Sequence, residues 1–235
     1  TTNIPIYLDA TAPTSRVLEE GFYRNSSTFE VKWKSLADSE DLEGYYIYYL
    51  EKDGNNLGDW TLLGFYNEEA VNFTGDAGLT YRFKSIAIDT NGNVENKGTY
   101  DTEMRIDLEL PKSTLWIVEG NLEFTNLDGI TIQWKANDTN DIQAYLIEYR
   151  TIGNETWDDF GAFTSPGEYW FSPNTDAQFE IRSRTVDYAG NKELKNQSDI
   201  IITFDRKKPE LVLKQINDLT GANELTVGIK TKSEN

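Results

Sequence analysis

The chain has 235 residues, of which 38% are hydrophobic and 13% aromatic, enough for packed cores and too many for a disordered chain. Its 22 basic and 40 acidic residues give a formal charge of −18, which would repel phosphate backbones, so no nucleic-acid partner is expected. Cysteine and histidine are absent, which excludes disulfides, thiolate metal sites and Ser-His-Asp or Cys-His catalysis within these residues.

In chain order, the same landmarks recur at a nearly constant spacing. Asp-x-x-x-Pro occurs at 9–13, 107–111 and 205–209, and Asp-x-x-Gly-Asn occurs at 89–93 and 187–191, each 98 residues apart. This period predicts tandem repeats. The expected division is 1–9 as the last strand of a preceding repeat, 10–107 and 108–205 as full sandwich domains, and 206–235 as the start of a third, incomplete repeat.

Each repeat alternates apolar and polar residues with period two and shows no helical apolar stripe, which predicts an all-β fold. Seven or so short strands in roughly 100 residues favour a two-sheet sandwich. The side chains expected to face the core are Trp33, Tyr45, Ile47, Tyr49, Tyr81, Phe83, Ser85 and Ala87, and in the second repeat Trp134, Tyr145, Ile147, Tyr149, Phe179, Ile181, Ser183 and Thr185. Arg82, Lys84, Arg182 and Arg184 are expected on the opposite, wetter face.

At these residues the chain resembles the immunoglobulin-like fibronectin type III family. The resemblance rests on Trp33 and Trp134 in the second strand, on Tyr-x-Ile-x-Tyr at 45–49 and 145–149, and on Leu-x-Tyr-x-Phe at 79–83. It implies tandem β-sandwich modules and a hydroxyl of Tyr81 that ties a loop, a bond that Phe179 cannot make. The Asp-x-x-Gly-Asn turn resembles that of repeat modules in large archaeal and bacterial surface proteins, including surface-layer (S-layer) glycoproteins.

No catalytic motif is present. Paired carboxylates such as Asp158 with Asp159, or Glu68 with Glu69, are interpreted as loop charges, so we expect no catalytic residue. The basic cluster at 206–208 is interpreted as part of a solvated linker. No apolar run of about 18 residues occurs, so no membrane-spanning segment is expected here.

The Asp-x-x-Gly-Asn turns have two interpretations. In the first, the aspartate caps its own turn and the glycine supplies positive φ, closing a hairpin without any cofactor. In the second, Asp89, Asn91 and Asn93 offer oxygen ligands to calcium, although the full calcium-binding loop motif is missing. We expect no metal or cofactor, and calcium is the alternative at this turn.

Two further sets of residues are candidates for contacts or modification. Outward-facing aromatic and basic side chains predict an interface with a neighbouring module or another subunit; the alternative is that the aromatic rings only shield the stems of the basic residues. The interface candidates are Tyr46, Tyr48, Arg82, Lys84, Ile86 and Ile88, and five Asn-x-Ser/Thr sequons stand at Asn25, Asn72, Asn137, Asn154 and Asn196.

Together these features favour a non-enzymatic segment of a large extracellular or cell-surface protein. The leading hypothesis is a set of S-layer or surface-glycoprotein modules that act as rigid building blocks or spacers, because proline in each joint limits bending. The partners expected are neighbouring repeats of the same chain, and self-assembly or another surface partner. The alternatives are an adhesin or receptor module that binds carbohydrate or protein, and an accessory segment of a surface hydrolase.

Overall fold

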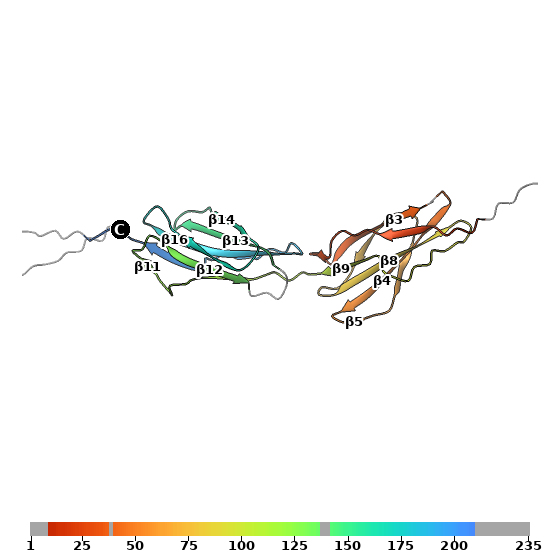
Figure 1. Cartoon of the computed structure of the whole chain (residues 1–235), viewed down its shortest axis with the longest axis horizontal. Helices are drawn as coiled ribbons and strands as arrows, with labels where there is room; N and C mark the ends of the chain where they lie inside the picture. Colours follow the sequence, from red (N-terminus) through yellow and green to blue (C-terminus); the bar gives the residue numbers. More distant parts are fainter. Residues whose placement is uncertain (1–8, 38–39, 137–141, 210–235) are drawn as a thin grey trace, which may run out of the picture. The chain divides into compact units, whose positions relative to one another are not determined.

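The computed structural model describes residues 9–37, 40–136 and 142–209 (Figure 1). These residues form strands, turns and loops, and no helix among them is long and apolar enough to cross a membrane. The predicted end segments, 1–9 and 206–235, and the sequon at Asn137 lie wholly or mostly outside the described residues.

The first repeat folds into two antiparallel-rich sheets. The smaller sheet has the order β1-β3-β7, and the larger has the order β2-β9-β8-β4-β5, with β6 also paired to β4. The strands are β1 (Thr14–Val17), β2 (Tyr23–Arg24), β3 (Thr28–Ala37), β4 (Leu42–Asp53), β5 (Asn56–Leu57), β6 (Thr61–Tyr66), β7 (Ala70–Thr74), β8 (Thr80–Asp89) and β9 (Thr102–Ile106).

The second repeat has a closely related arrangement. Its three-stranded sheet has the order β10-β12-β15, and its five-stranded sheet has the order β11-β17-β16-β13-β14. The strands are β10 (Ser113–Ile117), β11 (Phe124–Thr125), β12 (Ile130–Ala136), β13 (Ile142–Thr151), β14 (Asp158–Phe163), β15 (Gly167–Phe171), β16 (Gln178–Asp187) and β17 (Ile200–Phe204).

Each repeat is a sandwich whose two sheets bury their facing sides. In the first, Trp33 and Phe73 of the smaller sheet pack in one cluster with Tyr45, Ile47 and Phe83 of the larger. In the second, Phe171 of β15 meets Phe179 of β16, with ring centroids 5.3 Å apart. The all-β sandwich fold is therefore confirmed. Of the side chains predicted to face the core, only Tyr49 and Tyr149 are half-buried rather than buried.

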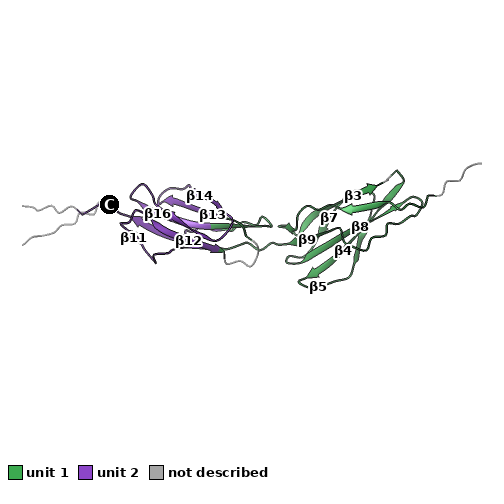
Figure 2. Cartoon of the chain, in the orientation of Figure 1, with its two compact units in different colours: residues 1–113, 136–145, 184–194 green, residues 114–135, 146–183, 195–235 purple. Residues whose placement is uncertain are grey.

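Strand pairing and spatial grouping divide the chain differently. Every strand pair described lies within 14–106 or within 113–204. In space the chain forms two compact units (Figure 2). One consists of residues 1–113, 136–145 and 184–194, and the other of residues 114–135, 146–183 and 195–235. The repeat boundaries at 107 and 205 stay sequence predictions.

The first strand of the first repeat is tied to the opposite sheet by carboxylates. Glu95 accepts hydrogen bonds from the backbone of Ser15 in β1 (3.1 Å) and of Ala87 in β8 (3.0 Å). Asp101 accepts from the backbone of Val17 (3.1 Å) and of β8 at Ser85 (2.9 Å). These side chains satisfy edge N–H groups that none of the described strands pairs, so they take the place of backbone acceptors in the ladder.

The second repeat uses the same device. Glu193 accepts from the backbone of Ser113 (3.0 Å) and Thr185 (3.1 Å), and Asp199 accepts from the backbone of Ser183 (2.7 Å). A lysine lies beside the acids in both repeats, with Lys97 3.0 Å from Asp101 and Lys195 3.0 Å from Asp199. The motif Glu-x-Lys-x-x-x-Asp at 95–101 and 193–199 therefore positions the first strand.

Tyr81 makes the loop bond that the resemblance implied. Its hydroxyl accepts a hydrogen bond from the backbone N–H of Asp76 at 2.8 Å, and its ring packs over Gly75, where a Cβ atom would come within 2.6 Å. Burial raises the pKa of the Tyr81 hydroxyl, because a phenolate would lose its hydration. The hydroxyl therefore stays a neutral partner for the loop.

We predict that Tyr81→Phe destabilises the first repeat by about 1 kcal/mol, because the Asp76 N–H loses its partner in the fold. Tyr66→Phe is the matched control, since the hydroxyl of Tyr66 makes only a long contact of 3.4 Å to the Leu63 carbonyl. Urea unfolding followed by tryptophan fluorescence measures both. Equal losses for the two variants, or none for Tyr81→Phe, would contradict the assignment.

Candidate functional site

The six predicted interface residues share the outer face of the larger sheet in the first repeat. Tyr46 lies opposite Ile86 and Tyr48 opposite Lys84 in the β4–β8 ladder, so the alternation places them on one side. The remaining candidates, Arg82 and Ile88, follow on β8 with the same parity, and all six are half-buried.

One end of this face is closed by its own charges. The Lys84 ammonium lies 4.3 Å from the ring centroid of Trp60 and 5.4 Å from that of Tyr48. Arg82 donates to Glu103 at 2.6 Å and stacks 4.3 Å from the ring centroid of Tyr100. Shielding of basic stems by aromatic rings, the alternative interpretation, is therefore present at Arg82 and Lys84.

Glu103 anchors this charged end. Burial favours the neutral acid and by itself raises the pKa of Glu103, but hydrogen bonds from Arg82 and Lys52 outweigh burial and lower that pKa below its usual range. The ionised Glu103 carboxylate stabilises the folded state at pH values above the pKa that Glu103 has in the unfolded chain. This contribution is lost as the pH falls through the lower pKa that Glu103 has in the folded state. At neutral pH the Glu103 carboxylate is therefore ionised and paired with Arg82 and Lys52.

The other end of the face is apolar and exposed. The rings of Tyr46 and Phe65 pack with centroids 4.9 Å apart, and Leu62 lies opposite Tyr48 in the ladder. Phe65 is 41% exposed and Leu62 50% exposed. Val94, also 50% exposed, bridges Ile88 at the far edge. We call Tyr46, Leu62, Phe65, Ile86, Ile88 and Val94 the apolar patch.

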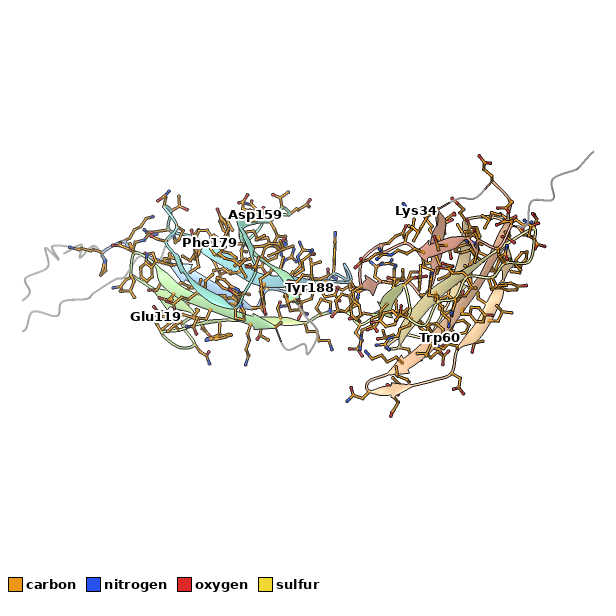
Figure 3. The ribbon with its side chains drawn as sticks, turned by 45° about the vertical axis from the view of Figure 1, so that its right-hand side comes forward. Lys34, Trp60, Glu119, Asp159, Phe179 and Tyr188 are labelled. Carbon is orange, nitrogen blue, oxygen red and sulfur yellow. The ribbon has the colours of Figure 1, made fainter. Side chains whose placement is uncertain are left out.

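Sequence reasoning missed the β6 half of this patch. A β-bulge between Ile47 and Tyr48 shifts the β4–β6 register, so Leu62 and Phe65, three residues apart, face the same side. Period-two alternation assigns them to opposite faces. Trp60, labelled in Figure 3, precedes β6 and joins the charged end. Trp60 and Trp157 stand at corresponding positions of the two repeats, 97 residues apart, and this correspondence was the signal that the sequence offered.

The corresponding face of the second repeat is covered by ion pairs. Arg182 donates to Glu148 at 2.6 Å and stacks 3.9 Å from the ring centroid of Trp157. Arg150 stacks on the same ring at 4.4 Å and pairs with Glu180. Arg182 is only 8% exposed. Arg182 lies on the predicted face opposite the core, but the expectation that it would be wet was wrong, because Trp157 and Glu148 cover it.

The aspartates of the Asp-x-x-Gly-Asn turns cap those turns in both repeats. Asp89 Oδ1 accepts from the backbone of Asn91 (3.0 Å) and Asn93 (2.8 Å), and Asp187 Oδ1 accepts from Asn191 (2.8 Å). Gly92 and Gly190 have φ of 86° and 89°, a conformation that favours glycine. The turns have the hairpin-closing geometry of the first interpretation.

The first repeat adds two acids to this turn. Carboxylate oxygens of Asp9, Asp41 and Asp89 lie within 4.8 Å of one another. The amide nitrogens of Asn91 and Asn93 face these acids as donors: Asn91 Nδ2 donates to Asp9 and Asp41, and Asn93 Nδ2 donates to Asp89. Of the side chains proposed as calcium ligands, the two asparagines therefore present N–H groups to the acids, and calcium here stays a hypothesis.

The remaining predicted features lie on the surface. Four sequon asparagines, Asn25, Asn72, Asn154 and Asn196, are exposed, and Asn72 lies within β7. The acidic pairs Glu68 with Glu69 and Asp158 with Asp159 are exposed as well, and Figure 3 shows Asp159 projecting from the surface. In the basic cluster, Arg206 pairs with Asp176 at 2.9 Å.

No protein-family model and no curated protein matches the chain. Among solved structures, it is similar to the FN1–FN3 domains of chicken CNTN1, at 11% identity over 85% of this chain and 70% of that chain, with a TM-score of 0.43. It is also similar to a two-domain fibronectin type III segment of chicken tenascin, at 12% identity over 82% of this chain and 97% of that chain, with a TM-score of 0.30.

We predict that Asp41→Asn raises the melting temperature of the first repeat at pH 7. The hydrogen bond with Asp9 raises the pKa of Asp41, so the folded state favours the protonated acid. A raised folded-state pKa means that this stability is present below the unfolded value, about 3.9, and is lost as the pH rises. Asparagine mimics the protonated form and avoids that loss.

Calorimetry at pH 7 and pH 3 measures the effect, which should disappear at the lower pH. A lower melting temperature for the variant at pH 7 would contradict it. The same instrument tests the calcium hypothesis: a melting temperature of the parent chain that calcium leaves unchanged would remove it, and a rise in the parent that Asp41→Asn abolishes would support it.

Proposed function

We propose that this chain is a non-enzymatic structural and interaction segment of a large prokaryotic cell-surface protein of the S-layer or surface-glycoprotein kind. The observation that carries the proposal is the contrast between the two repeats. The same sheet face is covered by ion pairs in the second repeat and presents the exposed apolar patch in the first.

The apolar patch suits contact with another protein. Phe65, Leu62 and Val94 are exposed beside Tyr46, Tyr48 and Ile88 respectively. Exposed apolar side chains are costly in water, and such patches mark association sites. Tyrosine and arginine are frequent at the centres of interfaces, and both stand on this face. We take the partner to be a second copy of the chain or a neighbouring module, since the repeats of an S-layer protein contact one another in the layer.

The joints between repeats support a spacer role. The aspartates of all three Asp-x-x-x-Pro segments accept a hydrogen bond from the backbone two residues later: Asp9 from Thr11, Asp107 from Glu109 and Asp205 from Lys207. Within the first compact unit, the N–H of Asp107 donates to Arg24 and its carbonyl accepts from Asn191. Such bonds, with the fixed φ of proline, reduce the freedom of the joint.

The sequons support exposure outside the cell. The four described asparagines have solvent-accessible positions, where a glycan would remain hydrated. The excess of acidic residues suits a protein that stays soluble and does not adsorb to anionic envelopes.

We predict that Tyr46→Ser combined with Tyr48→Ser weakens self-association about tenfold or more, which corresponds to about 1.4 kcal/mol. Sedimentation velocity over a concentration series measures the association. Leu146→Ser is the matched control, because Leu146 follows Tyr145 as Tyr46 follows Tyr45 but lies on the ion-paired face. Circular dichroism checks that the variants fold. A parent chain that stays monomeric, or assembly unchanged in the double variant, would refute the interface.

We predict that the protein purified from its native source carries glycans on exposed sequons, seen as hexose-type additions in the intact mass. Thr74→Ala removes the sequon at Asn72 while keeping the asparagine, and should remove one addition without affecting the others. A native mass equal to that of the bare polypeptide would contradict the prediction.

A further inference from the structure

The outer face of the β10-β12-β15 sheet carries two exposed tryptophans, Trp116 on β10 and Trp170 on β15. Their strand neighbours Leu115, Ile117 and Phe171 are buried, so alternation turns both indoles outward. Trp116 is 37% exposed, with the Lys135 ammonium 5.9 Å from its ring centroid, and Trp170 is 53% exposed. Exposing large indole rings to water is unfavourable, and such exposed apolar surface commonly marks a binding site.

A polar strip separates the two indoles. On the central strand β12, Thr131 lies opposite Trp170 and Gln133 lies opposite Glu168. The Gln133 amide donates to the Glu168 carboxylate at 3.1 Å, which leaves an amide oxygen and carboxylate oxygens facing the solvent. With β12 between them, β10 and β15 are about 10 Å apart, because neighbouring strands are separated by about 4.8 Å.

The backbone holds Trp170 in place. Its indole lies against Gly129, where a Cβ atom would come within 2.7 Å of the ring. Only a glycine at this position allows the ring to lie so close to the chain. The ring is thereby oriented before any ligand arrives, which reduces the entropy cost of binding.

The first repeat shows that the fold does not require tryptophans on the outer face of the three-stranded sheet. In the corresponding sheet of the first repeat, Asn72 lies opposite Glu30. This pair takes the position that Trp170 and Thr131 have in the second repeat. Lys32 pairs there with Glu20 and Glu30, each at 3.1 Å. A charged, self-paired surface therefore serves equally well as the outside of the sandwich, and the two tryptophans belong to the second repeat alone.

We propose that this face binds a neutral carbohydrate chain. A sugar ring has an apolar C–H face that stacks on an indole and a rim of hydroxyls that hydrogen-bond to amide and carboxylate oxygens. Two aromatic contacts at the edges with Gln133, Glu168 and Thr131 between them match that chemistry, whereas a protein interface has a contiguous apolar centre. The charge of −18 disfavours anionic polymers.

This site lies on another repeat and another sheet from the apolar patch. Glu119, labelled in Figure 3, marks its β10 side, where the carboxylate accepts from the backbone of Thr131 at 3.1 Å. Sugar binding and self-assembly depend on different side chains, so either proposal can fail without the other.

Affinity electrophoresis in gels containing mannan, xylan, dextran or hydroxyethylcellulose tests the proposal, with calorimetry on oligosaccharides of any polymer that retards the chain. At least one of these neutral polymers should retard the parent. Trp170→Ala and Trp116→Ala should each lower the affinity tenfold or more, Trp170→Phe should retain part of it, and Gln133→Ala should weaken it. Tyr188→Ala is the control, since it removes another exposed aromatic of the second repeat and should bind as the parent does.

Three results would overturn the proposal. One is that none of the four neutral polymers retards the parent, and another is that the tryptophan variants bind as the parent does. The third is that Trp170→Ala abolishes self-association in sedimentation, which would make the face a protein interface. Melting temperatures separate loss of binding from loss of fold, and Trp170→Phe keeps the test valid if an alanine variant unfolds.

Discussion

Each repeat depends on the closure of two sheets over one aromatic core. Trp33 and Phe73 meet Tyr45 and Phe83 in the first repeat, and Phe171 meets Phe179 in the second. The burial of these side chains supplies most of the stabilising free energy of a domain this small. Because folding depends on the side chains of the inward faces, those of the outward faces can differ between the repeats. The carboxylates of Glu95 and Glu193 complete the closure by joining the first strand to the opposite sheet.

The outward faces differ in a way that bears on function. On the larger sheet, the first repeat leaves Phe65 and Leu62 exposed, whereas the second closes the same surface with Arg150 and Arg182 stacked on Trp157. On the three-stranded sheet the contrast is reversed, with paired charges in the first repeat and two indoles in the second. One scaffold thus presents separate surfaces, which we assign to protein contact and to carbohydrate.

In this strongly negative chain, many acidic side chains accept hydrogen bonds that stabilise turns and strand edges. They cap the joints at Asp9, Asp107 and Asp205, close the hairpins at Asp89 and Asp187, and bridge the sheets at Glu95 and Asp101. Backbone N–H groups are the donors in most of these bonds, and Lys97 is in addition a basic partner of Glu95 and Asp101. The excess of acid over base is therefore partly a consequence of how turns and edges are built.

The amino-acid sequence by itself determined the repeat, the all-β class and the inward-facing residues, because side-chain period and turn chemistry are local properties. It also placed Tyr46 and Ile86 on one face, since both strands keep regular alternation. Only the tertiary structure brought Leu62 and Phe65 to that face, because a bulge in the β4–β6 ladder breaks the alternation. Likewise, only strand order set Trp116 and Trp170 on either side of β12, and only packing on Trp157 buried Arg182, since pairing between distant segments is decided by the whole fold.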